Sequence, residues 1–292
     1  MEHLTTKPHL LLDDPPLEFS EAALARIREI LKTRRNFDIG SYKDKYMKRR
    51  IAIRVRATRA ASLEAYSELI GANERELDLL LKGLTIHVSQ FFRNRSTFDK
   101  LHLEVLPALF ARLRREGREE ATIWSVGCAS GEEPYTLATI LRDWYAAELK
   151  QFKISLVATD INERILETAR RGEYVPERLQ EVPVGVRERH FQLREGKYLL
   201  SADVRKMVEF RRGDIFDLAT YPESDLILCR NVLIYFERGE QERILQGLAG
   251  ALSTGGVLVL GKAETLVGES RRRFATVCPV ERIYTKNRFS AF

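Results

Sequence analysis

The stretch TIWSVGCASGEEP, residues 122–134, joins an apolar strand, a turn with two glycines and a proline that favours the start of a helix. Gly127 and Gly131 allow a tight turn and a close approach of a ligand to the backbone. A strand, a glycine-bearing turn and a helix in this order are typical of the ligand-binding edge of a Rossmann-like sheet. This segment therefore predicts that the chain contains a Rossmann-like sheet with a ligand at this turn.

The residues around this turn narrow the ligand class. The glycines follow a GxxxG pattern, not GxGxxG, and Glu132 and Glu133 come directly after them. Two carboxylates would repel a pyrophosphate, which disfavours NAD or ATP. They suit a ligand with sulfonium and ammonium groups, such as S-adenosylmethionine. A structural role is the alternative, because the N-terminal end of a helix dipole also favours acidic residues.

Strands alternate with helices from Phe92 onward. This alternation predicts a mostly parallel, doubly wound sheet. The strands are expected at 122–126, 154–159, 226–229 and 257–261, and the helices at 96–115, 134–150, 163–171 and 239–252. Residues 274–285 read as one final strand that returns beside residues 257–261. Residues 190–193 and 198–201 alternate around a short turn and predict a hairpin.

The preceding part of the chain is helical in pattern. Residues 1–18 contain three prolines and are expected to form a flexible tail. Helices are expected at 22–32, 42–58, 63–70 and 74–84, where apolar residues recur at helical spacing. We therefore expect a helical domain with its linker over residues 19–91, an α/β domain over 92–292, and a small antiparallel β-subdomain inserted at about 183–207.

Composition restricts the class further. The chain has 292 residues, 44% of them hydrophobic, and a net charge of +6. Such a charge makes an acidic partner plausible. Apolar runs are only as long as a strand and the N-terminus lacks a signal-peptide pattern, so a cytoplasmic location is expected. Cys128, Cys229 and Cys278 have no metal-ligand spacing, so neither a disulfide framework nor a metal site is expected.

Three further segments carry polar residues where a ligand would meet the sheet. Asp160 follows the second strand, the usual place of the acid that binds a ribose, although it could instead cap the next helix. Asp214 follows later, where a third loop would meet an adenine. The run LILCRNVLIYF, residues 226–236, takes a buried strand into Arg230 and Asn231 and then into apolar residues around Tyr235, which composition alone assigns to the core.

The junction between the two predicted domains reads LTIHVSQFFR, residues 84–93. His87 and Ser89 alternate with apolar neighbours there, and ligand sites are common where domains meet. Arg93 ends the segment, and the residue pattern alone leaves open whether it is a ligand contact or a surface arginine.

Together these motifs resemble the chemotaxis-receptor methyltransferase (CheR) family from about residue 20 onward. The resemblance rests on Tyr42-Lys43 with Arg49-Arg50-Ile51, on residues 85–93 and 129–135, on Thr159-Asp160-Ile161, and on residues 229–236. It implies S-adenosylmethionine as methyl donor, S-adenosylhomocysteine as product, and glutamate side chains of chemoreceptors as acceptors.

The resemblance also implies roles for individual residues. Arg93 and Tyr235 are expected beside the transferred methyl group, where they would orient the acceptor. The residues expected to contact the cofactor are His87, Ser89, Arg93, Gly127, Glu132, Asp160, Asp214, Ile215, Asn231 and Val232. The family usually has Asn and Thr where this chain has His87 and Ser89, and Asn near the position of Asp214.

A basic stripe in the helical part suggests how an acceptor docks. Lys45, Arg49, Arg56 and Arg59 share one face of the helix expected at 42–58, whereas Met47, Ile51 and Val55 share another. The expected partner is the cytoplasmic region of methyl-accepting chemotaxis receptors, implied to be an acidic helical coiled coil. A solvated basic face is the plainer interpretation. We expect a monomer that meets the membrane only through receptors.

Two other functions compete with this one. An RNA methyltransferase would explain the basic helix but needs aromatic stacking platforms beside it, and only Tyr42 and Tyr46 are near. A regulator that binds the cofactor without catalysis is the third interpretation, and the retention of Arg93, Asn231 and Tyr235 argues against it. No nucleic-acid partner is therefore expected.

Overall fold

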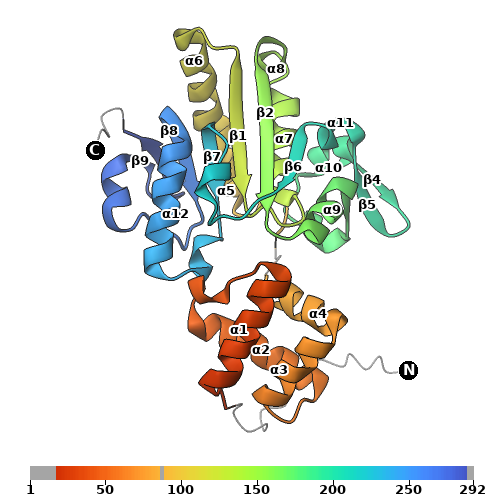
Figure 1. Ribbon diagram of the computed structural model, residues 1–292. Coiled ribbons are helices and arrows are strands. Elements are labelled where there is room, and N and C mark those ends of the chain that lie inside the picture. Colours follow the sequence, from red (N-terminus) through yellow and green to blue (C-terminus); the bar gives the residue numbers. More distant parts are fainter. Residues whose placement is uncertain (1–17, 86–88, 288–292) are drawn as a thin grey trace. The chain divides into compact units, whose positions relative to one another are not determined.

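The computed structural model describes residues 18–85 and 89–287, and the chain divides into two units between residues 86 and 87 (Figure 1). The first unit is helical, as expected. Its helices are α1 (Glu21–Arg35), α2 (Asp44–Thr58), α3 (Leu63–Ala72) and α4 (Glu74–Leu84), with a short 3-10 turn at Ile39–Ser41.

Side-chain caps explain where these helices begin. The hydroxyl oxygens of Ser20 and Ser62 accept hydrogen bonds from the backbone N–H groups of Ala23 and Ala65, both at 3.2 Å. The side chain of Asn73 does the same for α4. Such caps satisfy N–H groups that have no partner within the helix. The helices predicted to begin at residues 63 and 74 do begin there, each directly after a capping side chain.

The second unit contains a seven-stranded sheet in the order β6-β2-β1-β7-β8-β10-β9. The strands β6, β2, β1, β7 and β8 are parallel, whereas β10 is antiparallel to both β8 and β9. The Rossmann-like fold class is confirmed. Their bounds are β1 (Glu120–Val126), β2 (Lys153–Asp160), β6 (Val208–Arg212), β7 (Ser224–Cys229), β8 (Leu252–Leu260), β9 (Phe274–Cys278) and β10 (Ile283–Lys286).

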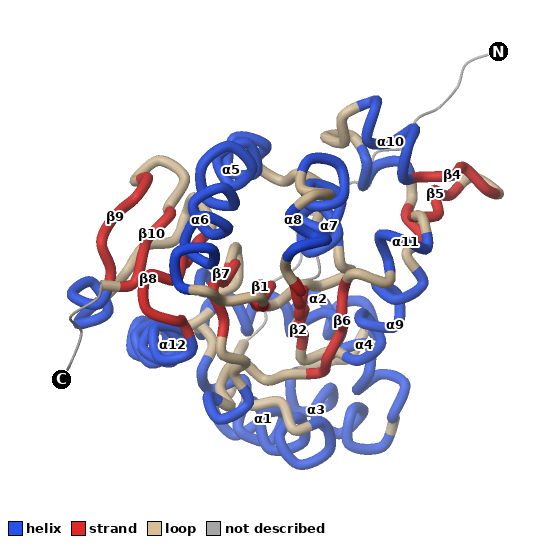
Figure 2. The backbone as a smooth tube through the Cα atoms, turned by 90° about the horizontal axis from the view of Figure 1, so that it is seen from above, coloured by secondary structure: helices blue, strands red, loops and turns tan. Residues whose placement is uncertain are grey.

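Helices cover both faces of this sheet. Figure 2 shows α6 (Leu106–Glu116) and α7 (Glu132–Trp144) on one side and α12 (Arg238–Ala251) on the other. The central strand β7 is buried at every position, as expected for a strand with covered faces. Shorter or peripheral helices are α5 (Arg95–Lys100), α8 (Glu148–Gln151), α9 (Glu163–Arg171), α10 (Val184–His190) and α11 (Ala202–Arg205).

The structure corrects three of the predicted elements. The single final strand expected over 274–285 is two strands, and only β10 lies beside β8, with Ile283 opposite Val259. The helix expected over 96–115 contains a π-helical stretch at Leu101–Val105. The helix expected over 134–150 ends at Trp144, because Tyr145 leaves the helical conformation and its ring packs against Phe110 at 5.3 Å.

The predicted hairpin is confirmed as β4 (Phe191–Arg194) and β5 (Lys197–Leu200), which project beyond the β6 edge of the main sheet (Figures 1 and 2). Glu195 and Gly196 form its turn, with φ values of 47° and 76°. Two central residues with positive φ match the twist of the flanking strands. A third strand, β3 (Glu173–Tyr174), pairs with β5 and was not predicted from the sequence.

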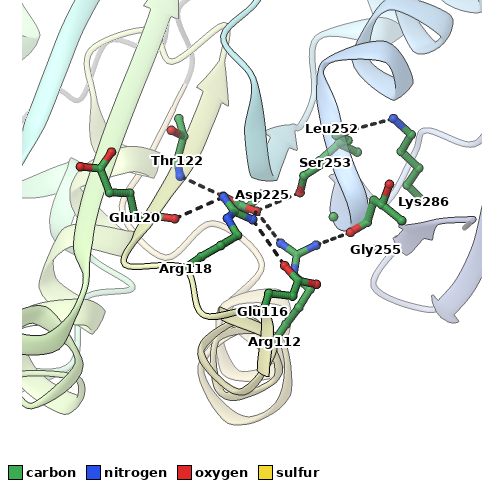
Figure 3. A network of polar contacts seen from close by, with 12 residues as sticks. Arg112, Glu116, Arg118, Glu120, Thr122, Asp225, Leu252, Ser253, Gly255 and Lys286 are labelled. Carbon is green, nitrogen blue, oxygen red and sulfur yellow. Dashed lines mark hydrogen bonds and ion pairs between the residues drawn. The ribbon is translucent and has the colours of Figure 1, made fainter. Parts of the chain in front are cut away.

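A buried carboxylate, that of Asp225, links several elements at the end of the sheet where the parallel strands begin (Figure 3). Asp225, near the start of β7, accepts hydrogen bonds from Arg112 at 2.6 Å and from Arg118 at 2.7 and 2.9 Å. The backbone of Thr122 and the hydroxyl of Ser253 add two more donors. This network joins α6, β1, β7 and β8. Within the described ranges, no helix combines the length and apolarity needed to cross a membrane.

Candidate cofactor and acceptor site

The turn after β1 has the backbone conformation that its glycines predict. Gly127 and Gly131 have φ values of 63° and 90°, and Ala129 between them has a φ of 50°. A Cβ on Gly127 would lie 2.6 Å from Cγ2 of Val232. A Cβ on Gly131 would lie 3.0 Å from both Ala169 and Phe210. Both positions therefore require glycine for conformation and for space.

Asp160 fastens this turn to the end of β2. One carboxylate oxygen accepts a hydrogen bond from the N–H of Ala129 at 3.0 Å, and the other accepts one from Asn162 at 3.0 Å. Asn162 caps α9, through the N–H of Ile165. The capping role weighed for Asp160 thus belongs to Asn162. Asp160 lies at the strand end expected for a ribose-binding acid.

Glu132 is fully buried at the start of α7. Its carboxylate accepts hydrogen bonds from the hydroxyl of Ser130 at 2.7 and 2.8 Å and lies 3.8 Å from Nε of Arg178. Burial raises the pKa of Glu132, while Ser130, Arg178 and Ser89 oppose that shift. A buried carboxylate with so few cationic neighbours suits a positively charged ligand.

Glu133 forms a closer ion pair than its neighbour Glu132. It pairs with Arg230 at 3.0 Å and accepts a hydrogen bond from the hydroxyl of Ser125 at 2.8 Å. The side chain of Arg230 is only 2% exposed and lies over the ring of Phe98, at 5.1 Å from its centroid. The structural interpretation therefore holds for Glu133. The importance of Arg230 was missed, because the sequence shows neither its buried carboxylate partner nor its contacts with distant backbone.

Arg230 also holds the segment that carries Arg93. Its guanidinium donates to the carbonyl oxygen of Arg93 at 2.7 Å and to the side-chain oxygen of Asn94 at 3.1 Å. The N–H of Phe92 donates to the hydroxyl of Thr136 on α7. Phe92 and Asn94, which flank Arg93, have φ values of 54° and 61°. These contacts impose a conformation that non-glycine residues seldom adopt.

A hollow of about 400 Å³ lies beside this segment. Arg178 holds the start of this segment, since its backbone carbonyl accepts a hydrogen bond from the N–H of Phe91 and its guanidinium donates to the carbonyl of Ser89. Two of the lining side chains, Arg93 and Arg95, are guanidinium groups, which suit a carboxylate. The residues around the hollow are Ser89, Gln90, Arg93, Asn94, Arg95 and Glu181.

The loop after β7 presents Asn231, Val232 and Tyr235. Asn231 has a φ of 60°, and Tyr235 is half-buried at the end of a short 3-10 turn. The loop rests on Glu264, whose carboxylate accepts hydrogen bonds from three of its backbone N–H groups. Burial raises the pKa of Glu264, and backbone N–H donors oppose that shift. Glu264 was not predicted from the sequence.

The remaining expected cofactor residues are placed as follows. Gly213 donates its N–H to the carbonyl of Asp160 at 3.0 Å, so the loop with Asp214 and Ile215 starts beside the end of β2. The side chain of Asp214 accepts a hydrogen bond from the N–H of Phe216, and the hydroxyl of Tyr221 donates to the carbonyl of Ile215. His87 lies outside the described residues.

The expected docking stripe lies in the helical unit. All four residues, Lys45, Arg49, Arg56 and Arg59, are exposed. Met47, Ile51 and Val55 are buried on the opposite side of α2, as their spacing predicts. Arg59 ends the helix in the left-handed conformation, with a φ of 56°.

These features define the class of the protein. The glycine turn and the acidic residues Glu132 and Asp160 suit a nucleoside with a cationic sulfur centre. Together with the matching family models, these features make the chain an S-adenosylmethionine-dependent methyltransferase.

Family models identify the branch of that class. The model described as "CheR methyltransferase, SAM binding domain" matches residues 87–281, and the model described as "CheR methyltransferase, all-alpha domain" matches residues 22–85. The chain belongs to the CheR methyltransferase family, as its motifs predict.

Individual relatives agree with this assignment. A chemotaxis protein methyltransferase of Listeria monocytogenes is 33% identical over 250 residues, which cover 85% of this chain and 92% of that protein. Chemotaxis protein methyltransferase 2 of Pseudomonas aeruginosa is 30% identical over 91% of this chain and 94% of its own length. An uncharacterized 104.1 kDa protein of Rhodobacter capsulatus is 34% identical over 84% of this chain, which spans only 26% of that longer protein.

Proposed function

We propose that the protein transfers a methyl group from S-adenosylmethionine to glutamate side chains in the cytoplasmic region of chemoreceptors, giving glutamate methyl esters. Two relatives that match along nearly their whole length are named chemotaxis protein methyltransferases. The observation that carries the proposal is the anchoring of Arg93. Its backbone is bound by Arg230, the residue before Asn231, so a guanidinium suited to a carboxylate is tied to the loop expected to meet the cofactor.

Methyl transfer to a carboxylate requires mainly that the protein position the acceptor and the methyl donor. The carboxyl group of a solvent-exposed glutamate has a pKa of about 4.3 and is ionised at neutral pH, so it needs no general base. The cofactor supplies an electrophilic methyl group on a sulfonium. Opposite charges on donor and acceptor disappear in the transition state, so in-line placement at roughly 3 Å and exclusion of water are the effective means of acceleration.

Each site residue then has a limited task. In the proposal, Glu132 and Asp160 hold the cationic and hydroxyl parts of the cofactor, with Asn231 and Ser89 as further polar contacts. Gly127, Val232 and Ile215 supply close backbone and apolar surface, and His87 and Asp214 complete the set. Arg93 and Tyr235 orient the acceptor carboxylate. Too many strong hydrogen bonds would reduce the nucleophilicity of the acceptor carboxylate. Orientation by a few hydrogen bonds therefore suits the reaction.

Docking is proposed for the helical unit. The exposed stripe of Lys45, Arg49, Arg56 and Arg59 would meet an acidic receptor surface. In some members of the family the small β-subdomain captures a peptide at the receptor's C-terminus by strand addition. Because the turn at Glu195-Gly196 is short, we propose that this chain needs no such peptide at the β4–β5 hairpin. We propose a cytoplasmic monomer that meets the membrane only through its receptor.

RNA is the weaker candidate acceptor. The ring of Tyr42 packs on Phe37 at 5.2 Å, and the ring of Tyr46 lies under Arg50 at 5.5 Å. Aromatic rings engaged in this way are less suited to stack on bases. This weighs against RNA as the partner of the basic helix.

The direct test incubates the protein with methyl-labelled S-adenosylmethionine and receptor-containing membranes. We expect label on the receptor band that mild base releases as methanol, because esters are labile to base. Receptors lacking their C-terminal peptide should be labelled equally fast, and much slower labelling would contradict the peptide-independent docking. Cofactor binding without any transfer to receptors would reject the proposed acceptor, and RNA would be tested next.

A further inference from the structure

Glu264 lies three residues after Gly261, in the segment that follows β8, and its side chain is almost completely buried. Its carboxylate accepts four hydrogen bonds from backbone N–H groups. One oxygen accepts from Asn231 at 2.9 Å and from Gly261 at 2.7 Å, and the other accepts from Val232 at 2.8 Å and from Ile234 at 3.2 Å. Three of the four donors belong to the loop that presents Asn231 and Tyr235.

The carboxylate of Glu264 is closely packed on the side of Gly261. A Cβ on Gly261 would lie 2.7 Å from the Glu264 carboxylate and 2.8 Å from the N–H nitrogen of Asn231. On its other side the loop meets the glycine turn, where Val232 fills the space in front of Gly127. The loop is therefore clamped between the turn after β1 and the carboxylate of Glu264.

We propose that Glu264 is a positioning residue for methyl transfer, which acts by fixing the backbone of residues 231–234. This inference rests on the proposed function, in which Asn231 contacts the cofactor and Tyr235 orients the acceptor. Asn231 has a positive φ, and the N–H groups of Asn231, Val232 and Ile234 all point toward the carboxylate of Glu264. Those N–H groups would be buried without acceptors if the carboxylate were absent, so the loop would rearrange.

The pattern of bonds requires a carboxylate and not merely a polar side chain. Each oxygen accepts two bonds, so a glutamine in either orientation would present an NH₂ group to two N–H donors. Glu264→Gln therefore loses two hydrogen bonds whichever way its amide faces. Glu264→Asp keeps both oxygens but on a shorter stem, so its effect should be smaller.

The test compares Glu264→Gln with Asp225→Asn, which removes a buried carboxylate at the opposite edge of the same sheet. Both variants are assayed at a temperature where circular dichroism shows them folded. We expect kcat/KM for receptor methylation to fall about tenfold or more in Glu264→Gln, and the Kd for S-adenosylhomocysteine, measured by calorimetry, to rise about fivefold. Asp225→Asn should leave both quantities near those of the wild-type protein.

A double-mutant cycle distinguishes an effect of Glu264 through the loop of residues 231–234 from a general loss of stability. If Glu264 acts through the loop, the total loss of kcat/KM in the double variant Glu264→Gln/Tyr235→Phe should be much smaller than the product of the two single losses. Independent, multiplying effects would overturn the proposal, as would wild-type kcat/KM and Kd in Glu264→Gln. Equal losses in Asp225→Asn would also overturn it, because stability alone would then explain them.

The two proposals fail in different ways. A wild-type protein that binds S-adenosylhomocysteine but labels no receptor would reject the acceptor and leave the role of Glu264 to be decided by the Kd comparison. Should Glu264→Gln not fold, Glu264→Asp is measured in its place, with a smaller loss expected in the same two quantities. Unchanged values in a folded Glu264→Asp would then count against the inference.

Discussion

Arg230 shows how strongly one side chain can depend on its surroundings. Its guanidinium is nearly inaccessible to water and is neutralised by Glu133, while two of its other contacts fix the segment around Arg93. A buried charge of this kind is tolerated only when it is paired and hydrogen-bonded. Loss of the carboxylate would therefore affect both stability and the position of Arg93.

Glu133→Gln should lower the free energy of unfolding by about 3–5 kcal/mol, because it leaves the Arg230 charge buried without its partner. We also expect kcat to fall, since Arg230, which anchors the Arg93 segment, loses the carboxylate that holds it in position. Urea unfolding and receptor methylation measure the two effects. Glu148→Gln is the control, because the Glu148–Arg114 pair is partly exposed to solvent and should contribute less than about 1 kcal/mol. Equal effects in the two variants would contradict this account.

Gly127→Ala tests the close approach of the two loops. The substitution places a side chain at a positive φ and brings its Cβ to 2.6 Å from Val232. We expect a loss of about 1–3 kcal/mol in unfolding free energy and weaker binding of S-adenosylhomocysteine.

Gly117→Ala provides the comparison for that variant. Gly117 has a φ of 62°, almost the same as Gly127, and a Cβ there would meet nothing within 4 Å. It therefore reports the backbone strain alone. If the two alanine variants were equally stable, the contact with Val232 would carry no cost and the clamped loop would be wrong.

Much of the site could be read from residue types at strand ends, but not all of it. Glu132 and Asp160 could be proposed from the sequence because each lies directly after a glycine turn or a strand. The roles of Arg230 and Glu264 could not be predicted, because these residues bind backbone groups or side chains that are far away in the sequence. No local pattern indicates that a carboxylate will accept four N–H groups. The roles assigned to Arg93, Tyr235 and the cofactor residues remain predictions.

At the scale of elements, the two faces of α2 differ in character. One is buried in the helical unit, and the other carries the exposed stripe. The double substitution Arg56→Glu/Arg59→Glu should reduce kcat/KM for receptor methylation about tenfold and flatten its dependence on salt, because it reverses charges that steer and dock an acidic partner. Binding of S-adenosylhomocysteine should not change.

A matched variant removes the effect of net charge. Arg26→Glu/Lys32→Glu reverses two exposed charges on α1 and leaves the protein with the same net charge as the α2 variant. It should methylate receptors at the wild-type rate. Equal losses from the α1 and α2 variants would show that total charge matters and that the stripe has no special role.

Periodicity predicted the long elements well, and its errors have physical causes. Helix α4 begins and ends where its apolar spacing predicts. Strand β6 was not predicted because its exposed positions carry charges, as in Glu209 and Arg211, and only two buried residues alternate with them. Strand β3 has two residues and exists only through its pairing with β5. The division of the final strand depends on tertiary pairing, which no local pattern contains.

For the molecule as a whole, the Asp225 network links stability to pH. Burial by itself raises the pKa of Asp225, but hydrogen bonds from Arg118 and Ser253 and the charges of Arg112 and Arg118 outweigh it and hold the pKa below the ordinary value. The folded state therefore binds fewer protons here than the unfolded chain. This contribution to stability is complete above the unfolded pKa of about 3.9 and is lost as the pH falls through the lower, folded value.

Asp225→Asn should consequently show a shallower decline of unfolding free energy below about pH 4 than the wild-type protein. Urea unfolding at a series of acidic pH values measures the slope. Asp203→Asn, which removes an exposed carboxylate paired with Arg142, should keep the wild-type slope. A parallel decline in all three proteins would contradict the role of the network.

The place of β10 between β8 and β9 has a consequence for biosynthesis. Among the described strands it is the last along the chain, yet it lies inside the sheet and not at an edge. At about 5–20 residues per second, a ribosome would finish β8 seconds before β10 could pair with it. During that interval β8 exposes unpaired backbone groups, which invite pairing with another chain. Release of a nascent chain that stops before Ile283 would make that exposure permanent, so such products should be substrates for chaperones and proteases.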